Sequence, residues 1–194
     1  VASLVGSEMC IRDRVYMGQV LQAGAGQAPA RQVALGCGMP NSTSCTTINK
    51  VCGSSLKAVM IAASEIRAGV SELVVAGGME SMSNAPRFIR EARRGEDVPF
   101  KSLLSILSHD GLTDAFSGEL MGNTGETCAL EYGISREESD AYSLRSHKLS
   151  AKGWENGGIE NECVSMEELS IDEGIRQDAD LSTLTSLKLS LIHI

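Results

Sequence analysis

Cys52 lies between a β-branched stretch and a long apolar segment, in the sequence Val51-Cys52-Gly53-Ser54-Ser55. A side chain placed where a strand turns into a helix is presented at the edge of a sheet, as the nucleophile is in strand–turn–helix elbows. The start of a helix favours a negative charge, and the thiolate is the reactive form of cysteine. These residues predict a nucleophilic thiol whose own backbone N–H can donate to an oxyanion. A buried structural cysteine is the other interpretation that they allow.

The segments that must position Cys52 alternate between strand and helix patterns. Apolar and β-branched content predicts strands at 15–21, 46–51 and 72–76, and helices are predicted at 29–37 and 54–68, each followed by a glycine. Helix 54–68 is apolar around most of its circumference, which predicts a buried helix. Strand, turn, helix and strand form a right-handed βαβ unit, so the first half of the chain is predicted to be α/β.

The second half of the chain has a different composition and is predicted to be mostly helical. A helix is predicted over 118–132, with Gly133 as its stop, and a capping box at 135–138 opens another that reaches about Lys152. A strand is predicted at 160–166. Residues 81–118 are irregular and charged, and a solvated face is predicted for the arginines Arg87, Arg90, Arg93 and Arg94. The change near Ser81 predicts the start of an inserted domain.

Composition excludes several classes of protein. The 194 residues include 17 Lys and Arg against 25 Asp and Glu, a net charge of −8, which argues against a nucleic-acid partner. No apolar run approaches the ~18 residues of a membrane span, and residues 1–14 do not follow the pattern of a signal peptide. The 6 cysteines are dispersed and far from histidine, which argues against a metal site and favours a reducing, cytoplasmic compartment. Packing roles are predicted for Cys37, Cys45, Cys128 and Cys163.

The sequence NKVCGSSLKA, residues 49–58, resembles the nucleophile motif of the thiolases. Other segments resemble the same family in the same order: VYMGQVLQAG (15–24), QAPARQ (27–32), AGGMESMS (76–83), DGLTDAF (110–116), YGISREE (132–138) and DEGIR (172–176). The chain is thereby identified as a member of this family. The resemblance implies part of the thiolase fold, a βαβ layer of the N-terminal half followed by a mostly helical inserted loop domain.

The resemblance also implies a division of the chain. Residues 15–82 correspond to a partial N-terminal thiolase domain with the nucleophile, and residues 83–188 to the loop domain on the CoA-binding side. Residues 1–14 and 189–194 have no counterpart in the family and are predicted to be non-native tails. The chain is therefore expected to be an internal fragment, about half of a subunit.

Thiolases make or cleave 3-ketoacyl-CoA. The resemblance implies that Cys52 attacks the thioester of an acyl-CoA, becomes acylated and passes the acyl group on. The acceptor is acetyl-CoA in a Claisen condensation and free CoA in thiolysis. CoA is thus a substrate, and no cofactor or metal is expected. A homodimer or homotetramer in fatty acid metabolism is expected for the parent protein.

Four more residues match CoA-handling positions of the family. Leu112 and Met121 match positions that line the pantetheine tunnel. Arg176 matches the arginine that meets the nucleotide end of CoA, where a planar guanidinium suits phosphate, and Thr183 matches a small polar position nearby. Leu120 stands where members that form acetoacetyl-CoA often carry a histidine before the methionine. Substrates with longer acyl chains are therefore an alternative to acetyl-CoA.

Three further catalytic elements of the family are a histidine in a G-H-P motif, a cysteine in a C-x-G motif and an N-E-A-F element. None occurs in this sequence, whose histidines are His109, His147 and His193, so the chain by itself is expected to be inactive. The alternatives for the parent are a non-catalytic thiolase-like acyl-CoA carrier and a longer-chain degradative 3-ketoacyl-CoA thiolase. The NKVCGS context speaks against a condensing enzyme that acts on a carrier protein.

Overall fold

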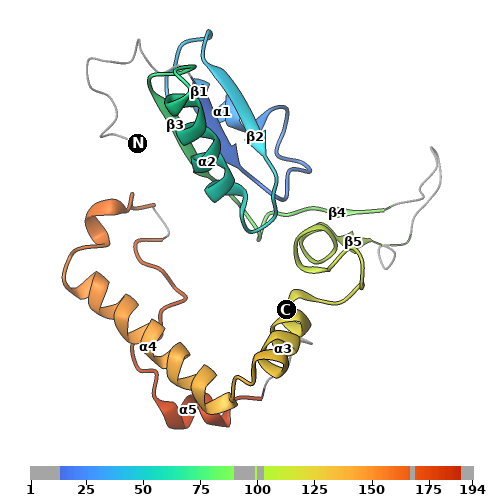
Figure 1. The fold of residues 1–194 in the computed structure, drawn as a ribbon, viewed down its shortest axis with the longest axis vertical. Coiled ribbons are helices and arrows are strands. Elements are labelled where there is room, and N and C mark those ends of the chain that lie inside the picture. The colour runs from blue at the N-terminus through green and yellow to red at the C-terminus, as the bar shows by residue number, and fades with distance from the viewer. Residues whose placement is uncertain (1–13, 90–98, 100–102, 167–168, 189–194) are drawn as a thin grey trace. The chain divides into compact units, whose positions relative to one another are not determined.

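The computed structural model describes residues 14–89, 99, 103–166 and 169–188, and the chain divides into two compact units at Gly118. The first unit begins with alternating strands and helices, β1 (Arg14–Gly18), α1 (Pro29–Gly36), β2 (Ser44–Ile48), α2 (Ser54–Arg67) and β3 (Val74–Gly78) (Figure 1). These elements confirm the predicted βαβ layer.

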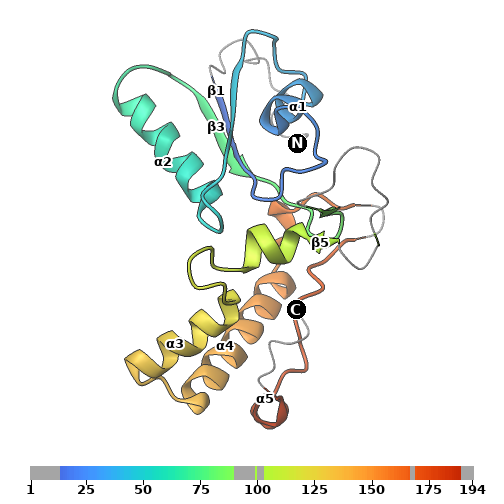
Figure 2. The ribbon, with the colours of Figure 1, turned by 90° about the vertical axis from the view of Figure 1, so that its right-hand side faces the viewer.

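The three strands form a parallel sheet in the order β2-β1-β3. Gly18 at the end of β1 pairs with Ile48 on one side and with Gly78 on the other, so the carboxyl ends of all three strands meet at one edge. Figure 2 shows α1 and α2 on opposite faces of the sheet. The connection from β1 to β2 and the connection from β2 to β3 run in opposite directions across the sheet. Two right-handed crossovers of this kind place their helices on opposite faces.

Small side chains bring both helices close to the sheet. Ala30 and Ala34 on α1, and Ala58 and Ala62 on α2, are buried and lie one helical turn apart. The α2 pair packs with the buried Tyr16 of β1, and the Tyr16 hydroxyl donates a hydrogen bond to the Glu65 carboxylate at 2.7 Å. The core between α2 and the sheet is therefore a thin layer of small side chains around Tyr16, with the Tyr16–Glu65 hydrogen bond at its margin.

The rest of the first unit is short and irregular. A two-residue pair, β4 (Arg87–Phe88) with β5 (Leu104–Ser105), leads into a π-helical turn, η3 (Leu107–Leu112). Ile106 is buried next to this turn, and the ring of Phe88 meets that of His109 edge-on. A solvated face was expected for four arginines, and one of them, Arg87, is exposed as expected. The other three members lie outside the described residues.

The second unit contains α3 (Met121–Tyr132), α4 (Arg136–Glu155), a 3-10 turn η4 (Glu160–Glu162) and α5 (Leu181–Ser186). Gly133 ends α3 in the left-handed conformation, and the predicted capping box forms: Ser135 accepts from Glu138 N–H while the Glu138 carboxylate accepts from Ser135 N–H. Arg136 donates to Asp140 and to the Leu184 carbonyl, which fixes α4 against α5. The predicted helices are thus confirmed.

Three predictions about packing and local structure are wrong. The strand predicted at 160–166 is replaced by η4, because Glu162 N–H and Cys163 N–H bond back to Ile159 and Glu160 within the turn instead of to a neighbouring strand. The helix predicted to be buried, α2, exposes Leu56 by 67%, since only one of its faces has the sheet beside it. Among the cysteines expected to pack, Cys45 is half-buried and Cys37, Cys128 and Cys163 are exposed.

The division into units falls later than the predicted domain boundary at residues 82–83, because the first unit extends to Gly118. This division follows the compactness of the present chain, and the assignment of 83–188 to a loop domain stays a prediction. β1 begins at Arg14, the last residue of the predicted tail 1–14, and Arg14 forms an ion pair with Glu65 at 3.3 Å. Residues 1–13 and 189–194 lie outside the described residues.

Candidate active site

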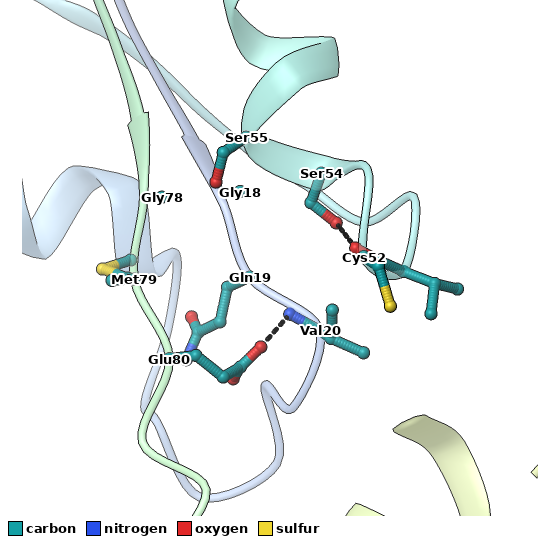
Figure 3. Close-up of a pocket in the computed structure, with 10 residues that line it drawn as sticks. Gly18, Gln19, Val20, Cys52, Ser54, Ser55, Gly78, Met79 and Glu80 are labelled. Carbon is teal, nitrogen blue, oxygen red and sulfur yellow. Dashed lines mark hydrogen bonds between the residues drawn. The ribbon is translucent and has the colours of Figure 1, made fainter. Parts of the chain in front are cut away.

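A pocket of about 350 Å³ lies at the edge where the three parallel strands end (Figure 3). Ligands of open α/β sheets bind outside the carboxyl ends of the strands, so this is the edge at which a site is expected. The residues lining it come from the segments that follow β1, β2 and β3: Gly18, Gln19, Val20, Val51, Cys52, Ser54, Ser55, Gly78, Met79 and Glu80. Cys52 is therefore the cysteine that the sheet brings to this pocket.

The turn that carries Cys52 is built by side-chain hydrogen bonds. Asn49 directly follows β2, and its side-chain oxygen accepts a hydrogen bond from Val51 N–H at 3.0 Å. Ser54, which is buried, accepts from Lys50 N–H at 2.8 Å and donates to the Val51 carbonyl at 2.6 Å. Between these two anchors Val51 has a φ of 48°, a left-handed conformation that a β-branched residue rarely adopts. Such outliers persist only where the surroundings over-determine them.

Cys52 directly precedes Gly53, the N-cap residue of α2, and its thiol is free and exposed. The backbone N–H groups of Lys50, Val51, Gly53 and Ser54 each donate a hydrogen bond within the turn. Across the described residues, Cys52 N–H is the donor of this turn to which no such bond is assigned. The arrangement offers a thiol beside an available N–H at a helix start, which is what attack on a carbonyl and support of an oxyanion require.

The wall opposite Cys52 is held by a carboxylate (Figure 3). Glu80 accepts hydrogen bonds from Val20 N–H at 2.8 Å and from Leu21 N–H at 3.1 Å, which fixes the segment after β1 to the segment after β3. Gln19 is buried there, with its Nε2 directed at the Leu21 carbonyl at 3.5 Å. The pocket thus has a rigid polar wall facing the turn of the thiol.

Two glycines let these segments come together. A Cβ on Gly18 would lie 2.6 Å from the backbone nitrogen of Ser55, and a Cβ on Gly78 would overlap the Ser55 hydroxyl. The first turn of α2 can approach the strand ends only because both positions lack a side chain. The small residues after Cys52 therefore have partners of matching size on the sheet.

The other residues predicted to handle CoA are placed as follows. Leu112 ends η3 and is half-buried in the first unit, where the neighbouring Gly111 faces Leu21. Met121 begins α3 in the second unit. Arg176 is exposed, with its backbone N–H 3.3 Å from His147 Nδ1, and Thr183 N–H donates to Asp180 at the start of α5. Leu112 is not among the residues that line the Cys52 pocket, and the CoA roles of all four residues stay predictions.

Sequence reasoning missed most of the pocket. Gln19 and Glu80 line it, and Asn49 bonds to two of its lining residues, yet their motifs do not mark them as site residues. A usable signal was present: in a parallel sheet, the residue after each strand belongs to the same edge, so the segments after β1 and β3 had to meet the nucleophile turn. Hydrogen bonds between those segments could not be deduced from the sequence.

Within the ranges that the structure describes, no group of three or more His, Cys, Asp and Glu residues is placed to hold a metal ion. Of the helices in the described part of the chain, none combines the length and apolar character that a membrane crossing requires.

The fold and the site define an α/β protein with a free cysteine in a pocket at the strand ends. The family model for the N-terminal domain of thiolases matches residues 8–191, nearly the whole sequence. The chain belongs to the thiolase family, as its motifs implied. The match includes residues 8–14 and 189–191, which the sequence analysis assigned to tails, and that assignment stays a prediction.

Relatives and a solved structure agree with this membership. The chain is 48% identical to acetyl-CoA acetyltransferase 2 of Arabidopsis thaliana over 79% of its own length and 38% of the relative's. It is 45% identical to a probable acetyl-CoA acetyltransferase of Escherichia coli over 87% of its length and 43% of the relative's. The Acat5 thiolase from Ascaris suum, solved in complex with coenzyme A, matches 93% of the chain and 47% of its own, with a TM-score of 0.81 and 35% identity. The chain thus spans less than half of the proteins that it resembles.

Proposed function

We propose that the protein to which this chain belongs transfers acyl groups between CoA thioesters, with Cys52 as the residue that becomes acylated. Cys52 Sγ forms a bond to the thioester carbonyl carbon, the bond from that carbon to the CoA sulfur breaks, and the CoA thiolate takes up the proton that Cys52 lost. The acyl group then passes to a CoA thiol or to the α-carbon of acetyl-CoA.

One observation carries this proposal: the free thiol of Cys52 lines a pocket at the strand ends, in a turn where no hydrogen bond from Cys52 N–H is assigned among the described residues. A tetrahedral intermediate formed on Cys52 would place its oxyanion near that N–H, and a lost oxyanion donor typically lowers the rate by about 10²–10³. The names of the relatives, acetyl-CoA acetyltransferases, and the coenzyme A complex of the Ascaris thiolase support the choice of substrate class.

The finer parts of the proposal follow from the family. Leu112, Met121, Arg176 and Thr183 are proposed to contact CoA, without any cofactor or metal. Leu120, half-buried at the start of α3, is compatible with substrates whose acyl chains are longer than acetyl, as in a degradative 3-ketoacyl-CoA thiolase. A cytoplasmic homodimer or homotetramer that acts in fatty acid metabolism is proposed for the whole protein.

The test is to expose the full-length protein to acetyl-CoA and acetoacetyl-CoA and to map acylated peptides by mass spectrometry. Acyl groups are expected on the peptide that contains Cys52, and Cys52→Ala is expected to abolish both the acyl-enzyme and thiolysis. Cys37→Ala is the matched control, because Cys37 is also a free, exposed cysteine of the first unit but does not line the pocket.

Two outcomes would contradict the proposal. Thiolysis that survives in Cys52→Ala would assign the chemistry to another residue. Tight acyl-CoA binding without any acylated Cys52 would support the non-catalytic carrier. A series of acyl-CoA substrates from acetyl to octanoyl, compared by kcat/KM, would determine the preferred chain length.

A further inference from the structure

Asn49 connects the turn that carries Cys52 to the opposite wall of the pocket. Its Oδ1 accepts the hydrogen bond of Val51 N–H at 3.0 Å, and its Nδ2 donates to the Val20 carbonyl at 3.4 Å. Val51 and Val20 both line the pocket, whereas Asn49 does not. A single exposed side chain therefore bonds to two of the segments that line the pocket.

Val51 needs this support because of its conformation. Its φ of 48° is left-handed, and for a residue with a branched Cβ this conformation is strongly disfavoured. The bond to Asn49 Oδ1 satisfies the Val51 N–H, and the bond from Ser54 Oγ at 2.6 Å satisfies the Val51 carbonyl. Without Asn49, one of the two anchors of the strained residue is lost.

The other end of the Asn49 bridge is itself fixed. Val20 N–H donates to the Glu80 carboxylate at 2.8 Å, so the Val20 carbonyl that receives the Asn49 amide lies in a restrained peptide segment. The network therefore runs from Glu80 through Val20 and Asn49 to Val51. It connects Val51, the residue before Cys52, to the segments that follow all three strands.

We infer that Asn49 is a positioning residue for the acyl transfer, acting by holding Val51 left-handed so that Cys52 Sγ and N–H keep their places at the pocket. The inference rests on the proposed function, because it assigns Asn49 a task only if Cys52 reacts. Asn49 does not touch the reacting atoms. Its effect passes through the backbone of Val51.

The test compares Asn49→Ala, Asn49→Asp, Val51→Gly and the double variant Asn49→Ala with Val51→Gly in the full-length protein. Each is measured by kcat and KM for acetoacetyl-CoA thiolysis, and by the second-order rate of Cys52 alkylation with iodoacetamide. Asn84→Ala is the matched control, since Asn84 is an exposed asparagine of the same unit that bonds only to nearby Ser81 among the described residues.

Asn49→Ala is expected to lower kcat about tenfold or more, the population shift that corresponds to a left-handed non-glycine residue, with little change in KM. Asn49→Asp keeps the acceptor for Val51 N–H and is expected to recover most of kcat. Glycine adopts the left-handed conformation unaided, so Asn49→Ala is expected to have a much smaller effect in the Val51→Gly background. If Asn49 had a merely structural role, Asn49→Ala would lower kcat and the alkylation rate equally in both backgrounds.

An unchanged kcat and alkylation rate in Asn49→Ala would overturn the inference, and so would an equal loss in the Val51→Gly background. If Asn49→Ala does not fold, the double variant decides: it is expected to fold and react, and its failure to do so counts against the inference. If the wild-type protein forms no acyl-Cys52, the proposed function fails, whereas the alkylation rates still measure whether Asn49 positions the thiol.

Discussion

The backbone nitrogen of Ser55 lies so close to Gly18 that a Cβ at position 18 would sit 2.6 Å from it. This contact joins the last residue of β1 to the first turn of α2, the helix that follows the Cys52 turn. Both atoms belong to backbones, so neither can move away as a flexible side chain would.

Gly18→Ala should therefore destabilise the first unit and displace the pocket. Forced overpacking of this kind costs about 1–3 kcal/mol, and the free energy of unfolding should fall by that amount in urea titrations. Gly36→Ala is the control, because a Cβ at the end of α1 meets nothing within 4 Å, and it should be neutral or stabilising. A Gly18→Ala protein as stable as the wild type would show that α2 can move without loss.

Gly78 and Ser55 should be energetically coupled. A Cβ on Gly78 would overlap Ser55 Oγ and lie 3.2 Å from the Gly18 carbonyl oxygen, so Gly78→Ala should destabilise the protein. Replacing Ser55 by glycine removes the first clash but not the second. A double-mutant cycle by chemical denaturation should give a coupling free energy above about 0.5 kcal/mol, and additive effects would contradict this contact.

Tyr16 should make stability depend on alkaline pH. Its burial, together with the hydrogen bond and negative charge of Glu65, raises the pKa of the Tyr16 hydroxyl. A raised pKa in the folded state means that the contribution to stability is complete below the ordinary tyrosine pKa of about 10 and is lost as pH rises through the folded value. Tyr16→Phe should lower the free energy of unfolding by about 1–2 kcal/mol at neutral pH. The stability of this variant should then decrease less steeply than that of the wild type as the pH rises.

Melting curves between pH 7 and 11 would measure this difference. Tyr132→Phe is the matched control, because the Tyr132 side chain is 75% exposed and should change neither the stability nor its pH dependence. An alkaline loss of stability that is the same in Tyr16→Phe and in the wild type would remove Tyr16 from the explanation.

The capping box of α4 should make the second unit sensitive to acid. Hydrogen bonds from Ser135, chiefly from its backbone N–H, lower the pKa of the Glu138 carboxyl. A lowered pKa in the folded state gives a contribution to stability that is present above the ordinary glutamate pKa of about 4.3 and is lost as pH falls through the folded value. Ser135→Ala should cost about 1 kcal/mol of helix stability at neutral pH.

Helix content followed by circular dichroism from pH 7 to pH 3 would test this. Glu138→Gln keeps an oxygen acceptor but cannot titrate, so its acid loss should be smaller than that of the wild type. Glu137→Gln, at the neighbouring position outside the box, should retain the wild-type profile. The interpretation is wrong if Glu138→Gln and the wild type lose helix in parallel.

The apolar outer face of α2 should promote self-association of the 194-residue chain. Val59 is 49% exposed and Met60 is 51% exposed, next to Leu56 on the same helix. Exposed apolar patches of this kind are common sites of association. Met60→Lys should lower the light scattering of the chain at a given concentration, whereas Ala58→Lys, at a buried position facing the sheet, should unfold it. Unchanged scattering in a folded Met60→Lys variant would exclude this face.

Much of the fold was predictable because its signals are local. Pro29 marks the first turn of α1 and Gly38 lies just after its end, and the β-branched content around Val74 marks β3. The S-x-x-E spacing that begins at Ser135 predicted a capping box, since both of its hydrogen bonds join residues within one helical turn. The strand predicted at 160–166 failed for the opposite reason: a strand exists only where another segment is placed to bond with it.

The sequence by itself determined which residue is the nucleophile candidate, because Cys52 has its chemistry and its place before a helix regardless of the rest. Only the tertiary structure decided what surrounds it. Glu80 reaches the segment after β1 across 60 residues of chain, and Gln19 lies inside the same wall. Such contacts depend on the order of strands in the sheet, and strand order is a non-local property that neither residue pattern nor spacing encodes.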